Sequence, residues 1–176
     1  MASKANRNQW YSRGSRWVQL GICFFGIPAG AMAANNCAWI NETTASSLLG
    51  GDAVGQVSAA DAGQTTVCTF TQTGTDVVRT LRVTVEIAAD PHARVGALAQ
   101  SCGADSAPLK AIGNEALTCS ADDRKGGPSE RLVGRVRDQV FTITIASTLK
   151  KDSALTRDSL HAKIYLAAEQ VAGNLF

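Results

Sequence analysis

The sequence lacks most of the features by which cytosolic enzymes and membrane proteins are recognised. It has 2 histidines among 176 residues, aromatic residues make up 6%, and no acidic residue precedes Glu42. Neither the Gly-x-Ser-x-Gly motif of serine hydrolases nor a Cys-x-x-Cys redox motif occurs. The apolar run Trp17–Pro28 is shorter than the roughly 20 residues that a membrane-spanning helix needs. These absences argue against a serine hydrolase, a thioredoxin-like site and a membrane-spanning helix.

The N-terminal segment has the layout of a secretory signal peptide. The apolar run is preceded by four basic residues, Lys4, Arg7, Arg13 and Arg16. It is followed by Ala31-Met32-Ala33, the A-x-A pattern of signal-peptidase sites. We expect cleavage after Ala33, which leaves residues 34–176 as a single periplasmic or secreted domain. The alternative is an uncleaved anchor or a buried N-terminal helix, which Gly26 and Pro28 would interrupt.

The net charge of the mature chain and the residues that precede two of the cysteines indicate which partners and anchors to expect. The signal peptide holds four of the 17 Lys and Arg residues and none of the 15 acidic ones, so the formal net charge changes from +2 to about −2 (thirteen against fifteen). A basic footprint for nucleic acid is therefore absent. Cys23 follows Ile22 and Cys37 follows Asn36, where a lipid-attachment site needs a small residue. We expect no stable membrane anchor after cleavage.

Four cysteines follow the predicted cleavage site: Cys37, Cys68, Cys102 and Cys119. An even number in an exported chain indicates two disulfides, and four cysteines allow three pairings. We favour Cys37–Cys68 and Cys102–Cys119, because each pair is nearest along the chain and ties a helix-bearing segment to a later strand. The alternative is a metal or redox site, but neither histidine has ligand spacing from any cysteine.

Four segments alternate apolar and polar residues with the period of two that is typical of half-buried β-strands. They are residues 65–72, 81–87, 132–136 and 141–145. In 81–87 and 141–145 the apolar residues occupy the odd positions, which we expect to face the core. Residues 137–139 form the expected hairpin turn, and weaker patterns indicate strands near 53–58 and 116–120.

Helices are predicted from caps and spacing. Asn41 can cap a helix over 42–49 that stops at Gly50-Gly51, and Asp90 can cap a helix that begins at Pro91.

A longer helix with apolar residues at spacings of three and four is expected behind Thr156 or Asp158. The order of elements predicts an α+β fold, a single domain in which an antiparallel sheet packs with helices.

Several short motifs of the chain together carry a resemblance to a known protein family. They are Cys37-x-Trp39-Ile40, Ala45-x-x-Leu48-Leu49-Gly50, Cys68-x-Phe70, Ile112-Gly113-Asn114-Glu115-Ala116, Val-Arg-Asp-Gln-Val-Phe at 136–141, and an Ala-rich terminal helix. Together they resemble uncharacterised envelope lipoproteins of actinobacteria, which are similar in layout to the extracellular sensor domain of a mycobacterial receptor kinase and to PsbP-like folds. The resemblance implies a cell-envelope role and a PsbP-like α/β/α sandwich. The family's lipid-attachment motif is missing here, and the resemblance transfers no functional residue.

The most suggestive surface is the polar side of the predicted sheet. Because side chains alternate between the two faces of a strand, one face should carry the candidate binding residues Arg82, Thr84, Glu86, Arg135 and Arg137, together with Thr142 and Thr144. Arginine forks and hydroxyls would suit an anionic ligand or a partner protein. The alternative is an ordinary solvated sheet face.

Other candidates for chemistry have simpler explanations. Ser147-x-x-Lys150 matches the motif of penicillin-interacting enzymes but follows a strand and lacks the partner motifs, so we interpret it as coincidence. His92 and His161 are expected on solvated helix faces, and the 112–116 loop is expected to be a turn around Gly113.

We identify no catalytic residue, metal site or cofactor. The favoured hypothesis is a non-catalytic exported envelope protein that binds a partner protein, a small ligand or a cell-wall component. The alternative is a small extracytoplasmic hydrolase or transferase whose site is assembled from residues distant in sequence, which would require a pocket where a base meets an orienting group.

Overall fold

The computed structural model describes residues 36–60, 63–102, 105–121 and 126–176, so the predicted signal peptide lies outside the described residues. Its elements are α1 (Glu42–Leu49), β1 (Ala53–Ala60), β2 (Thr65–Thr73), β3 (Val78–Ile87), α2 (Pro91–Gln100), β4 (Ala107–Leu109), β5 (Glu115–Ser120), β6 (Ser129–Val136), β7 (Gln139–Ser147) and α3 (Arg157–Leu175). The strands form one seven-stranded antiparallel sheet in the order β1-β2-β3-β7-β6-β5-β4. The α+β fold predicted from the sequence is confirmed.

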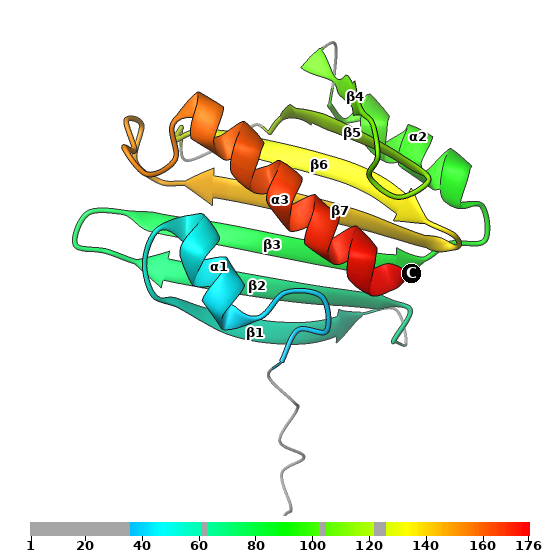
Figure 1. The fold of residues 1–176 in the computed structure, drawn as a ribbon, viewed down its shortest axis with the longest axis horizontal. Helices are drawn as coiled ribbons and strands as arrows, with labels where there is room; N and C mark the ends of the chain where they lie inside the picture. The colour runs from blue at the N-terminus through cyan, green and yellow to red at the C-terminus, as the bar shows by residue number, and fades with distance from the viewer. Residues whose placement is uncertain (1–35, 61–62, 103–104, 122–125) are drawn as a thin grey trace, which may run out of the picture. The chain divides into compact units, whose positions relative to one another are not determined.

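Helices pack on both faces of the sheet. Figure 1 shows α1 and α3 lying across one face, while α2 lies behind the β5 and β6 side of the sheet. The main core forms under α1 and α3, where inward residues of β3 and β7 such as Leu81, Val83 and Ile143 are fully buried. A smaller core forms under α2 around Val95, Val133 and Val140. We call the first side the helix face and the second the open face, because α2 covers only part of it.

The predicted caps form as expected. Asn41 accepts a hydrogen bond from the Thr44 amide at 2.8 Å, Asp90 caps α2, and Thr156 rather than Asp158 caps α3. Gly50 ends α1 in the left-handed region, with φ of 77°. None of the helices in the described ranges is long and apolar enough to cross a membrane.

Both predicted disulfides are present, Cys37–Cys68 and Cys102–Cys119. The first joins the segment before α1 to β2, and the second joins the end of α2 to β5. Two disulfides indicate an oxidising extracellular or periplasmic environment.

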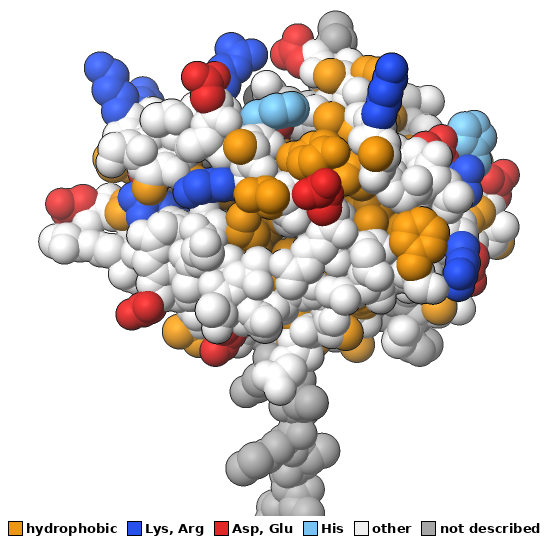
Figure 2. Space-filling view, viewed as in Figure 1, with side chains coloured by type: hydrophobic (Ala, Val, Ile, Leu, Met, Phe, Trp, Pro, Cys, Tyr) orange, Lys and Arg blue, Asp and Glu red, His pale blue; other side chains and the backbone are white. Residues whose placement is uncertain are grey.

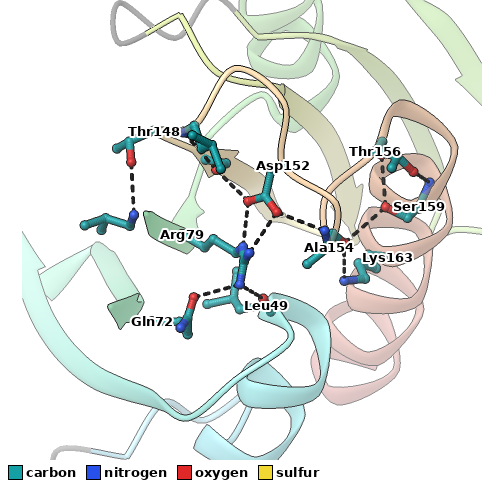
Figure 3. Close-up of polar contacts among 12 residues, drawn as sticks. Leu49, Gln72, Arg79, Thr148, Asp152, Ala154, Thr156, Ser159 and Lys163 are labelled. Atoms are coloured by element: carbon teal, nitrogen blue, oxygen red, sulfur yellow. Dashed lines mark hydrogen bonds and ion pairs between the residues drawn. The ribbon is translucent and has the colours of Figure 1, made fainter. Parts of the chain in front are cut away.

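A buried ion pair connects three parts of the helix face (Figure 3). Arg79 of β3 donates to Asp152 from Nε at 2.6 Å and from Nη2 at 2.8 Å, and it also contacts Gln72 and the Leu49 carbonyl. The Asp152 side chain is 0% exposed and that of Arg79 is 12% exposed. Hydrogen bonds from Arg79 hold the pKa of Asp152 well below its ordinary value. Through these contacts, the loop between β7 and α3 is held against both β3 and the end of α1.

Three details differ from the sequence prediction. Ile87 was expected to face the core but is 59% exposed, because it ends β3 opposite Gln139, at the limit of the paired region. The hairpin turn contains only Arg137 and Asp138, since Gln139 already belongs to β7. The short edge strand β4 was not predicted, because three residues that include Pro108 carry no periodic signal.

Candidate functional site

A hollow of about 420 Å³ lies on the open face, beside α2. Its floor consists of side chains of β3 and β7, all polar except Val140, and its wall consists of residues of α2 and β6. The lining residues are Thr80, Arg82, Thr84, Glu86, Arg94, Leu98, Arg131, Val140, Thr142 and Thr144. The hollow therefore contains three guanidinium groups, one carboxylate and the hydroxyls of four threonines. Of the candidate binding residues, Arg82, Thr84 and Glu86 lie here together with Thr142 and Thr144, as strand parity predicted.

Arg82 lies in the middle of the floor. The antiparallel register places it between Thr69 of β2 and Thr144 of β7, and its side chain is exposed. Within the described part of the chain it has no ion-pair partner. Its five N–H groups are available to an incoming acceptor.

Arg131 lies across Thr144 from Arg82. Its Nη1 donates to Ser101 Oγ at 3.2 Å, which holds the side chain against the end of α2. Its Nε is buried and has no hydrogen-bond partner among the described residues. The remaining N–H groups of the Arg131 guanidinium are the ones that can meet an acceptor in the hollow.

The third arginine of the hollow is already paired. Arg94 of α2 donates to both carboxylate oxygens of Glu86. The hydrogen bond to Glu86, opposed in part by burial, raises the pKa of Arg94 above its ordinary value. The pair joins α2 to β3 and cancels its own charge, which leaves the positive charge of the hollow on Arg82 and Arg131.

The other two candidate residues lie elsewhere. Arg135 is on the open face but is engaged at the α2 edge, where its Nε donates to Glu115 Oε1 at 2.6 Å. Burial alone would raise the pKa of Glu115, but hydrogen bonds from His92 and Arg135 lower it below its ordinary value. Arg137 lies in the turn with φ of 55° and its guanidinium lies over the Phe176 ring at 6.0 Å. The structure therefore does not bring Arg137 to the hollow, because the strand pattern ends one residue before it.

Sequence reasoning missed Arg94, Leu98 and Arg131. Two of these belong to α2, whose packing over β6 and β7 no local pattern reveals. Arg131 is followed by Leu132 and Val133, which are both buried although they face opposite sides of the sheet. The alternation of apolar and polar residues that would reveal a polar face is therefore lost in this strand. The only available signal was that Arg131, Val133 and Arg135 share one parity.

A second cleft, of about 830 Å³, lies between the first turn of α3 and the strands β5 and β6. His161 contacts Glu130 through Nδ1 at 2.9 Å, and buried Thr118 donates to the same carboxylate oxygen at 2.7 Å. A base thus meets an orienting carboxylate. Within the described ranges, however, no hydroxyl or thiol is hydrogen-bonded to His161, so the nucleophile of a triad is not in place.

The remaining sequence candidates have structural roles. Ser147 is 1% exposed and donates to Asp152 at 2.7 Å, so the Ser-x-x-Lys match lies in the buried network and not in a cleft. Gly113 has φ of 58°, and a Cβ there would lie 2.3 Å from the Arg135 carbonyl oxygen, so the 112–116 loop is a tight turn. Groups of three or more potential metal ligands do not occur within the described residues.

The helix face offers a less suitable surface. Figure 2 shows hydrophobic side chains gathered over the region of α3, interrupted by charged ones. Leu166 and Phe176 are exposed there by 57% and 64%. Exposed apolar residues interrupted by charges are ordinary for a folded protein, so the open face remains the better candidate.

Comparisons with known proteins place these features in context. No model of a protein family matches the chain, and no curated protein sequence matches it. Among solved structures it is similar to aphrodisin, a sex pheromone from the female hamster, with 11% identity over 73% of this chain and 79% of that chain, at a TM-score of 0.22. A likeness of that size carries no argument about function, so the open-face hollow is interpreted from its own geometry.

Proposed function

We propose that this chain is a non-catalytic, exported protein of the cell envelope that binds an anionic ligand in the open-face hollow. The observation that carries the proposal is the pair of uncompensated guanidinium groups, Arg82 and Arg131, on either side of Thr144. Guanidinium groups bind carboxylate and phosphate oxygens through charge-assisted, often bidentate hydrogen bonds. Thr84 and Thr142 add hydroxyls that can donate to the same oxygens.

The location rests on separate support. The basic, apolar and A-x-A regions of residues 1–33 have the order of a signal peptide, and two disulfides fit an oxidising compartment. The motif resemblance to actinobacterial envelope lipoproteins and PsbP-like folds supports an envelope role. A cell that exports the chain should yield protein that begins at Ala34 and lacks the four hydrogens lost in two disulfides. An intact mass that includes Met1 would contradict export.

Ligand binding is tested by titrating the purified chain with inorganic phosphate, sulfate, citrate and galacturonate at low ionic strength, followed by NMR or calorimetry. At least one of these anions should bind saturably, and added salt should weaken it because the hollow is open to solvent. Arg82→Gln and Arg131→Gln should each weaken binding about 10- to 100-fold, since a hydrogen bond to a charged group contributes roughly 1.5–3 kcal/mol.

Arg157→Gln is the matched control, because Arg157 is exposed on α3 and does not line the hollow. It should leave binding unchanged. The proposal is wrong if none of the four anions binds saturably, or if all three variants bind as the wild type does.

A further inference from the structure

One row of side chains extends the hollow across the open face. The strand register places Gln56 opposite Thr69, Thr69 opposite Arg82, Arg82 opposite Thr144, and Thr144 opposite Arg131. Five neighbouring strands thus contribute one polar residue each at the same level of the sheet. With about 4.8 Å between strands, the row spans roughly 19 Å.

The rows on either side are interrupted by apolar residues. The next row in one direction reads Ser58, Val67, Thr84, Thr142, Val133, and in the other direction it reads Val54, Thr71, Thr80, Ala146, Ser129. Among these three described rows, only the row from Gln56 to Arg131 is polar without interruption. We call it the polar track.

The polar track combines two kinds of hydrogen-bonding side chain. Gln56, Thr69 and Thr144 carry groups that both donate and accept hydrogen bonds, whereas Arg82 and Arg131 only donate and carry charge. The two arginine Cα atoms are separated by two strand spacings, or about 10 Å. A matching ligand has anionic groups at regular intervals and, between them, hydroxyl-like groups that both donate and accept hydrogen bonds. Carboxylate-bearing polysaccharides have this pattern, while a phosphate chain offers acceptors throughout.

The track is closed at one end and open at the other. Beyond Arg131 the next residue in register is Cys119, which is buried in its disulfide, and Ser101 of α2 holds the arginine from the side. At the other end Gln56 is exposed on the edge strand β1. A chain can therefore extend past β1 into solvent but not past β6.

Within the described ranges, the open face has no aromatic side chain on which a neutral sugar could stack. The described aromatic residues lie elsewhere: Phe70 and Phe141 are in the main core, Trp39 and Tyr165 pack against it, and Phe176 contacts Arg137. Polar and ionic contacts must then supply the affinity. This favours an acidic polymer over a neutral one.

From the register of the polar track we infer that the ligand of the open face is a linear acidic polysaccharide, bound across the strands with two of its carboxylates on Arg82 and Arg131. The inference rests on the proposed anion-binding function and extends it from the hollow over β2 and β1. Gln56 and Thr69 are then positions that bind a polymer but not a single sugar, because they lie outside the hollow.

The test compares galacturonate with its linear oligomers at low ionic strength. The oligomers should bind at least 10-fold more tightly than the monomer. Thr69→Val, which removes only the hydroxyl, should weaken oligomer binding several-fold and leave monomer binding unchanged. Thr71→Val is the matched control, because Thr71 has the same strand and face but belongs to an interrupted row. It should change neither. Far-UV circular dichroism and urea midpoints confirm that each variant is folded.

Three results would overturn the inference. Equal affinities for monomer and oligomer, with both still sensitive to Arg82→Gln, would leave the hollow as a small-anion site and remove the track. Equal losses in Thr69→Val and Thr71→Val would also remove it. Tighter binding of polyphosphate or of a neutral maltooligomer than of oligogalacturonate would contradict the polymer class. If Arg82→Gln weakens neither galacturonate ligand but still weakens phosphate, sulfate or citrate, the inference fails while the proposed function stands; if it weakens none of these anions and Arg131→Gln also has no effect, both fail.

Discussion

Replacing Asp152 by alanine tests whether the buried ion pair fastens the fold. Asp152 accepts four hydrogen bonds: two from Arg79, one from Ser147 Oγ at 2.7 Å and one from the Ala154 amide at 2.9 Å. The substitution would leave Arg79, at 12% exposure, with its charge uncompensated in a largely buried site. Breaking a buried pair in this way costs about 3–5 kcal/mol. A domain of this size has a free energy of unfolding of roughly 5–15 kcal/mol, so the loss should be large.

A double-mutant cycle separates the pair from the general cost of each substitution. Arg79→Ala should cost about as much as Asp152→Ala, because it leaves a buried carboxylate. The double variant should cost clearly less than the sum, with a coupling energy of about 2–3 kcal/mol.

The assay is urea unfolding followed by circular dichroism at neutral pH with both disulfides intact. The midpoint should shift while the slope of free energy against urea stays constant, which indicates that the unfolded state is unchanged. Ser153→Ala, an exposed position in the same loop, is the control and should change stability by less than about 0.5 kcal/mol. A loss below about 1 kcal/mol for Asp152→Ala, or strict additivity in the cycle, would refute the assigned role.

Three further predictions concern stability. Arg79 lowers the pKa of Asp152 in the folded state only, so the ionised carboxylate stabilises the fold fully above about pH 4, and this stabilisation is lost as the pH falls below that value. The free energy of unfolding should therefore fall less steeply with decreasing pH in Asp152→Asn than in the wild type. Equal slopes in the two proteins would contradict this. Gly113→Ala should lower the free energy of unfolding by about 3 kcal/mol in urea, because φ is positive there and the Arg135 carbonyl blocks a Cβ. The control Gly96→Ala, in α2, should instead stabilise the protein by about 0.5–1 kcal/mol. Similar effects of the two substitutions would count against the turn assignment. Replacing Cys37 and Cys68 together should lower the free energy of unfolding by about 4 kcal/mol, the value that the chain-entropy model gives for a separation of 31 residues. A thermal midpoint that does not fall would show that the disulfide adds little to stability.

The local features of the fold could be predicted from the sequence. Asn41 and Asp90 identified the starts of two helices, and Thr156 was one of two candidate caps for the third, because capping depends on residues three positions apart. The alternation in β3 and β7 identified the strands and which side of each faces the core, because the side-chain period is a backbone property. The disulfide pairing followed from nearness along the chain.

The features that depend on distant contacts could not be predicted. Arg79 and Asp152 are separated by 73 positions, and neither has a pattern that marks it as buried. The hollow needed α2 to supply Arg94 and Leu98, and α2 packs mainly on β6 and β7. Arg82, Thr84 and Glu86 were found because they share one strand, while Arg131 was missed because its strand is buried on both faces near its middle.

The Cys37–Cys68 disulfide also determines how the domain bears mechanical load. A pull applied to the chain ahead of Cys37 passes through the sulfur bridge directly into β2, so α1 and β1, which lie inside the covalent loop, carry none of it. The edge strand of the sheet therefore cannot be peeled away from that end, and a protease cut within the loop would leave both fragments attached. Reduction would reverse this, because the same pull would then unwind α1 first and next strip Gln56 and the rest of β1 from β2.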